Sequence, residues 1–190
     1  MDGRNLRTAV ALMLLPLAAS AADPAWIGEA RTVATSVPPK LLAVLRAEID
    51  KGGPEGAIAT CSEVAPQLAR EASQASGWAI RRVSLRQRNP KAVPDDWERA
   101  TLQDFDRRAA AGENPATLER AEAVSVDGQT VWRYMRALPT QELCLNCHGP
   151  ADKLSAAVRA QLQSRYPNDL AVGYSVGQIR GAMTIRKPQP

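Results

Sequence analysis

The sequence predicts an α+β fold in which an antiparallel sheet packs against an N-terminal helical layer. One observation is that apolar residues in the segment 39–68 recur at three- and four-residue intervals, which is typical of helices. The other is the pair of strand-like segments 118–126 and 129–137, which are joined by Asp127-Gly128. Asp-Gly between two such segments favours a tight hairpin, so the sheet is expected to be antiparallel.

The first 21 residues have the features of a secretory signal peptide. Arg4 and Arg7 precede an apolar run, residues 8–17, and Ala19-Ser20-Ala21 is a small-residue cleavage site. The run is interrupted by Pro16 and is shorter than the roughly 20 apolar residues of a membrane-spanning helix. We therefore expect a periplasmic protein without a membrane anchor, cleaved near Ala21, with residues 22–190 forming one domain.

Three helices are predicted next, over residues 24–34, 39–51 and from Pro54 onward. Pro38-Pro39 is expected to break the first from the second, and Gly52-Gly53 to end the second. On the third helix, an apolar stripe contains Ile58, Cys61, Val64 and Leu68. Pro66 removes one backbone donor, so we expect a bend near Ser62.

The remaining elements follow from local patterns. A strand is predicted over residues 78–85, and a helix from Pro94 to Gly112 with acidic residues in its first turn. After the hairpin, Thr140 is a candidate cap for a short helix that carries Cys144 and Cys147. An amphipathic helix is expected around Leu154, Val158 and Leu162, and a final strand places Ile179, Gly181, Met183 and Ile185 on one face.

The charge of the chain does not indicate a nucleic-acid partner. The 24 Lys and Arg residues exceed the 20 Asp and Glu residues by only four, and no aromatic-studded basic stripe is present. Some arginines could pair with carboxylates of a cofactor. Arg82, Arg86 and Arg88 are the ones considered, without an assignment.

The segment Cys144-Leu145-Asn146-Cys147-His148 matches the attachment motif of c-type haem. Two cysteines three positions apart, about one helical turn, can each form a thioether bond, and the adjoining His148 can reach the iron. His148 is the only histidine in the chain, which excludes a second imidazole ligand. We therefore predict one covalently attached haem c with His148 as an axial ligand.

Two other interpretations use the same residues. Cys144 and Cys147 could form a thioredoxin-like disulfide, but that motif belongs to a βαβ unit, which the antiparallel pattern does not suggest. Alternatively, Cys61, Cys144, Cys147 and His148 could form a three-Cys, one-His zinc site in a structural module without haem. Its weakness is that the neighbours Cys147 and His148 would have to converge on one ion.

The residue patterns leave the sixth iron position open. Cys61, Met135, Met183, a lysine or no protein ligand are all compatible with the sequence. Methionine would raise the reduction potential, an anionic thiolate would lower it, and an open position would admit small gases.

The chain resembles a family of single-haem c-type proteins with a PAS-like fold, found as free periplasmic proteins and as sensor domains of receptors. The segments that carry the resemblance are Gly77-Trp78 through Arg82-Val83-Ser84, Arg88-Asn89-Pro90 with Pro94-Asp95 and Trp97-Glu98, Tyr134-Met135-Arg136-Ala137, the Cys144–His148 motif with Gly149, and Gly173-Tyr174 through Arg180-Gly181-Ala182. The resemblance implies a PAS-like sheet and iron ligation by His148 and Cys61. Ala92 departs from the family, whose Asn-Pro loop often has a second Asn there.

We therefore expect a periplasmic haem protein that transfers electrons or senses redox state or gases such as carbon monoxide and nitric oxide. Its protein partner is not identifiable from the sequence. Peroxidase-type catalysis would lack its usual helpers, since there is no second histidine and no acid or base can be placed beside the iron. We expect a carrier or sensor rather than an enzyme.

Overall fold

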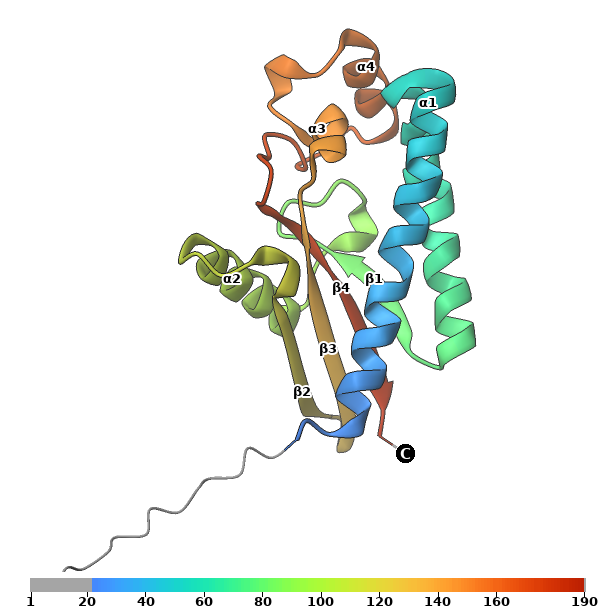
Figure 1. Ribbon diagram of the computed structural model, residues 1–190. Coiled ribbons are helices and arrows are strands. Elements are labelled where there is room, and N and C mark those ends of the chain that lie inside the picture. The colour runs from blue at the N-terminus through green and yellow to red at the C-terminus, as the bar shows by residue number, and fades with distance from the viewer. Residues whose placement is uncertain (1–21, 190) are drawn as a thin grey trace, which may run out of the picture.

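An antiparallel sheet with the strand order β1-β4-β3-β2 forms the centre of the fold in the computed structural model, which describes residues 22–189 (Figure 1). The strands are β1 (Ala79–Val83), β2 (Glu119–Val126), β3 (Gln129–Pro139) and β4 (Ile179–Pro188). The helices are α1 (Ala25–Ser76), α2 (Asp96–Ala110), α3 (Glu142–His148) and α4 (Ala156–Arg165), with short 3-10 turns at Pro90–Ala92, Pro115–Thr117 and Ala151–Lys153. The α+β prediction is confirmed, and the predicted signal peptide lies outside the described residues.

The N-terminal helical layer is a helical hairpin rather than three separate helices. Its two halves fold back on each other at Gly52-Gly53, where Gly53 adopts a φ of 73° (Figure 1). The predicted break at Pro38-Pro39 is wrong, because the backbone stays helical there and also through Pro66. Burial of the flanking Ala34 and Val37 against the sheet offsets the backbone hydrogen bonds that the prolines remove. Within residues 22–189, no helix combines the length and the apolar character needed to cross a membrane.

The sheet is covered on both faces. α1 packs on one face through a cluster that includes Ala30, Ala34 and Met183, and α2 packs on the other through Leu102 and Phe105 (Figure 1). Because both faces are covered, the central strand β4 is buried continuously from Gly181 to Ile185. The sheet therefore separates an α1 side from an α2 side.

Local signals predicted α2 and the hairpin correctly. Asp95 caps α2 by accepting a hydrogen bond from the backbone N–H of Glu98, whose carboxylate accepts one from the N–H of Asp95, both at 2.9 Å. The β2–β3 turn places Asp127 at a φ of 50° and Gly128 at 80°, which is the reason that Asp-Gly is favoured there.

The N-cap of α3 was predicted wrongly, because it is Gln141 and not Thr140. Thr140 is buried, and its backbone N–H donates to Gln178 O at 2.8 Å while its carbonyl accepts from Gly177 N at 2.9 Å. These bonds hold Thr140 to the loop before β4, so α3 begins one residue later. α4 follows the prediction for Val158 and Leu162, whereas Leu154 precedes its N-cap, Ser155, and lies outside the helix.

A β-bulge in β4 changes the direction of its side chains. On β3, Ala137 and Pro139 pair with Ala182 and Ile179, so that two steps on β3 match three on β4. The expected common face holds for Met183 and Ile185, which pack on the α1 side, but is wrong for Ile179, which packs on the α2 side with Ala182. Gly181, at a φ of 150°, lies within this bulge.

A carboxylate at the start of β2 ties the helical layer to the sheet. Glu119 accepts hydrogen bonds from Arg31 at 2.6 Å, from the Tyr134 hydroxyl at 2.6 Å and from Arg136 at 2.8 Å. The bond from Arg31 is the main reason that the pKa of Glu119 falls from 4.5 to about 2. Since the folded state lowers this pKa, charged Glu119 stabilises the fold at neutral pH.

We expect this stabilisation to be lost as the pH falls from 4.5 through about 2. Glu119→Gln should therefore lower the free energy of unfolding at neutral pH by about 1–3 kcal/mol and flatten its acid dependence. Urea unfolding near neutral pH and near pH 3 measures both effects. Glu71→Gln, at an exposed position on α1, is the control, and equal acid dependence of Glu119→Gln and the wild type would contradict the prediction.

Candidate cofactor site around Cys144–His148

The C-x-x-C-H segment lies on helix α3, which follows the end of β3 and contacts α1 near α4 (Figure 1). Cys144 is buried on this helix, and Cys147 is partly buried and packs near Ile58 and Val158. Both cysteines are free thiols. One helical turn therefore presents both sulfurs beside α1.

A cavity of about 210 Å³ opens on the α1 side of the sheet. Its polar and reactive lining includes Cys61, Cys144, Cys147, His148, Arg82, Arg88 and Arg180, whereas Val37, Leu41, Leu42, Leu45, Ile49 and Ile58 of α1 form an apolar wall. The fold thus brings Cys61 to the C-x-x-C-H segment, although the two are far apart in the sequence. A large apolar group with charged edges would suit this lining.

The orientation of the His148 imidazole is set by the backbone. Its Nδ1 lies 2.7 Å from the carbonyl oxygen of Ala171, so Nδ1 carries the proton in the neutral ring and donates to that carbonyl. Burial lowers the pKa of His148 well below its usual range, which keeps the ring neutral. Nε2 is left with a lone pair, which faces an Arg180 guanidinium nitrogen at 3.4 Å.

Two of the sulfur candidates for the position opposite His148 line the cavity. Cys61 lies on α1, has an exposed side chain and lines the cavity, and desolvation by the surrounding protein atoms raises the pKa of its thiol. Met183 also lines the cavity. Met135 does not, because it is fully buried in the cluster on the α2 side, and no lysine is among the described lining residues.

Three arginines converge on the cavity, and sequence reasoning missed one of them. Arg88 is held by Asp169 at 2.9 Å and donates to the Cys147 carbonyl at 2.6 Å. Arg82 and Arg180 each have a buried Nε without a hydrogen-bond partner, and no acidic residue of the described chain pairs with them. Arg180 reaches this side because of the bulge at Gly181, which a lone glycine in a strand could have suggested. Arg86, which the sequence had also suggested, does not line this cavity.

Arg82 remains cationic despite its surroundings. Burial, followed by the nearby Arg180 guanidinium, lowers the pKa of Arg82 to about 9, which is still above neutral pH. Two uncompensated positive charges therefore face the cavity. Such charges are costly to bury unless a negative group accompanies them.

The geometry gives no support to the two other interpretations of the motif. Among residues 22–189, no three or more His, Cys, Asp or Glu side chains lie close enough together to hold one metal ion, which the zinc interpretation requires. The thioredoxin-like disulfide belongs to a βαβ unit, whereas every strand pair described here is antiparallel.

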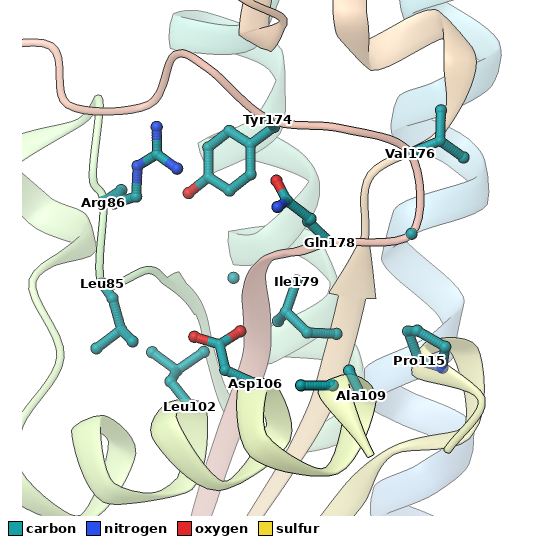
Figure 2. A pocket seen from close by; sticks show the side chains of 13 residues that line it. Leu85, Arg86, Leu102, Asp106, Ala109, Pro115, Tyr174, Val176, Gln178 and Ile179 are labelled. Atoms are coloured by element: carbon teal, nitrogen blue, oxygen red, sulfur yellow. The ribbon is translucent and has the colours of Figure 1, made fainter. Parts of the chain in front are cut away.

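A second cavity, of about 550 Å³, is larger but lies on the α2 side and contains no cysteine or histidine (Figure 2). The smaller cavity is therefore the better candidate for a covalently attached cofactor, because the chemistry of the lining decides attachment and volume does not.

The antiparallel sheet, the helical hairpin and the C-x-x-C-H segment facing a cavity together define an α+β protein with a candidate cofactor site. Within that class, the chain belongs to the Tll0287-like family, whose model matches residues 8–188. Its structure is similar to the crystal structure of the cyanobacterial heme-protein Tll0287, with 25% sequence identity and a TM-score of 0.63 over 89% of this chain and 98% of that chain. No curated protein matches this chain.

Proposed function

We propose that this chain is a periplasmic haem protein with one haem c, attached through Cys144 and Cys147 and ligated by His148 and Cys61. The observation that carries the proposal is that these four residues line one cavity. The likeness to a cyanobacterial heme-protein and to its family supports haem as the cofactor. In this proposal residues 1–21 direct export, and residues 22–190 form one haem-binding domain with a PAS-like sheet.

The lining of the cavity fits the chemistry of haem. A porphyrin is a flat apolar ring with two carboxylate-bearing propionates, and the cavity combines an apolar helical wall with the unpaired cations Arg82 and Arg180. Guanidinium pairs well with carboxylate, so these two residues are the candidates for holding the propionates. Such pairs would also give the buried Nε atoms of Arg82 and Arg180 the hydrogen-bond acceptors that they lack.

Each residue of the site has a defined task. Ala171 holds His148 in the tautomer whose Nε2 can bind iron, and the apolar residues of α1 exclude water. Arg180 must release its contact with Nε2, since one lone pair cannot serve both a guanidinium and a metal. Haem would supply one-electron chemistry, and Cys61, as a protein ligand besides His148, would tune that chemistry.

Covalent attachment is the first test of the proposal. A pyridine haemochrome spectrum of the purified protein is expected to show haem that resists acid–acetone extraction. Cys144→Ala and Cys147→Ala should each remove one thioether bond and shift the haemochrome band, whereas Asn146→Ala, between them, should not. Absence of covalent haem in the wild type would contradict the proposal.

Electron transfer and sensing differ in whether Cys61 stays bound after reduction. A carrier would keep both His148 and Cys61 as ligands, whereas a redox or gas sensor would lose Cys61 as a ligand on reduction. Carbon monoxide is expected to shift the absorption spectrum of the reduced protein only if that position opens. A shift therefore supports sensing, and no shift at any pH supports electron transfer to a protein partner.

A further inference from the structure

Arg88, in the loop after β1, connects two backbone segments that meet at His148. Its Nη2 donates to the carbonyl of Cys147 at 2.6 Å and to the carbonyl of Ala171 at 3.3 Å. Cys147 directly precedes His148, and the Ala171 carbonyl is the acceptor that lies 2.7 Å from the His148 Nδ1. One guanidinium group therefore fixes both the backbone that carries this imidazole and the oxygen that orients its ring.

Asp169 closes this arrangement into a ring of hydrogen bonds. Its Oδ2 accepts from Arg88 Nε at 2.9 Å, and its Oδ1 accepts from the backbone N–H of Ala171 at 2.8 Å. Ala171 is thus held at its N–H by the carboxylate and at its carbonyl by the guanidinium. Both charged side chains are only 11% exposed, so water and salt screen the pair little.

Arg88 differs from the other two arginines of the cavity because its charge is already balanced. Arg82 and Arg180 each have a buried Nε without a hydrogen-bond partner, whereas the Nε of Arg88 is bonded to Asp169. Since this ion pair carries no net charge, Arg88 does not need an anionic ligand to offset its burial. Its hydrogen bonds go to groups of the protein, which suits a residue that positions another one.

Sharing the Ala171 carbonyl also affects the His148 imidazole electronically. An oxygen that already accepts a hydrogen bond from a cation is a weaker acceptor for a second donor, so the ring gives up less of its Nδ1 proton. A ring that keeps this proton is a weaker electron donor through Nε2. A weaker donor stabilises ferric iron less, so Arg88 is placed to raise the reduction potential of an iron bound to His148.

We infer that Arg88, held by Asp169, is the positioning residue for the axial ligand His148 and raises the reduction potential of the haem through the Ala171 carbonyl. The effect on the potential rests on the proposed haem function. The orientation of the imidazole does not depend on that function, because the hydrogen bonds that set it lie within the protein.

The double variant Arg88→Gln/Asp169→Asn tests the inference without changing the net charge. Both charged groups become neutral amides, so a change in potential reports the lost hydrogen bonds rather than a lost charge. We expect a lower potential than in the wild type by potentiometric titration, and shifted g values in the ferric electron paramagnetic resonance spectrum. Arg108→Gln/Glu113→Gln removes an ion pair of 2.8 Å near the end of α2 and should leave both readouts unchanged.

A second variant and a stability measurement separate positioning from a merely structural role. Arg88→Lys keeps a cation beside Asp169 but lacks the planar fork that reaches both carbonyls. It should therefore fold and still lower the potential and shift the g values, with urea unfolding as the check of the fold. Wild-type potential and g values in either variant would overturn the inference, whatever the stability of that variant.

Labelling histidine with ¹⁵N gives a readout that does not need haem, because His148 is the only histidine. Absence of covalent haem in the wild type would overturn the proposed function and the effect on the potential, but not the positioning. In that protein, the ¹⁵N chemical shifts of the ring should show the tautomer protonated at Nδ1, whereas the double variant should show a mixture of both tautomers. Equal tautomer populations in the two proteins would overturn the positioning as well.

Discussion

Cys61→Ala is expected to abolish the low-spin ferric signal that a histidine–thiolate pair gives in electron paramagnetic resonance. Cys61 lines the cavity together with His148, and alanine at this position cannot bind iron. An anionic thiolate stabilises ferric iron, so its loss should also raise the reduction potential by on the order of 0.1 V, a modest part of the range that axial ligands span. Potentiometric titration with optical detection measures the second effect.

Met183→Leu is the matched control for Cys61→Ala. Met183 is the other sulfur candidate on the cavity wall, and leucine preserves its apolar volume at little cost in stability. We expect the low-spin signal and the potential to persist in this variant. An unchanged spectrum in Cys61→Ala together with a changed one in Met183→Leu would assign the position to the methionine and refute ligation by Cys61.

Gly181→Ala is expected to have the largest effect on stability. Gly181 adopts a φ of 150°, which a residue with a side chain rarely adopts, and an added Cβ would lie 2.3 Å from the carbonyl oxygen of Val83. That oxygen belongs to the backbone of β1, so it cannot rotate away. Strain of this kind costs about 1–3 kcal/mol, and the clash adds to it, so the free energy of unfolding should fall by about 3 kcal/mol or more.

The same substitution tests the role of the bulge in the cofactor site. If Gly181→Ala shifts β4 out of its bulged register, Arg180 leaves the cavity, and haem incorporation should fall with stability. Gly56→Ala is the control, since a Cβ there meets nothing within 4 Å, and in a helix it should be neutral or stabilising by up to about 1 kcal/mol. Wild-type stability in Gly181→Ala by urea unfolding would disprove this account of the bulge.

Much of the fold could be predicted from the sequence because its signals are local. Asp127-Gly128 specifies a turn within a few residues, and Asp95 with Glu98 specifies the start of α2 in the same way. The failures occurred where a distant partner competes with a local preference. Pro38-Pro39 predicts a break in the helix, yet the helix continues because the neighbouring residues Ala34 and Val37 are buried against the sheet. Thr140 reads as a cap, yet its backbone pairs with the loop before β4.

The candidate site also has one part that local sequence signals predict and another part that depends on contacts between distant residues. The sequence by itself determined that Cys144, Cys147 and His148 form a C-x-x-C-H motif and so predicted haem attachment there, because the motif depends only on spacing within one helical turn. Only the tertiary structure decided which distant side chains share the cavity. The packing of α1 places Cys61 at the cavity. Met183 and Arg180 line the cavity and Met135 does not, because the faces of β3 and β4 depend on strand pairing and on one bulge, which no local pattern specifies.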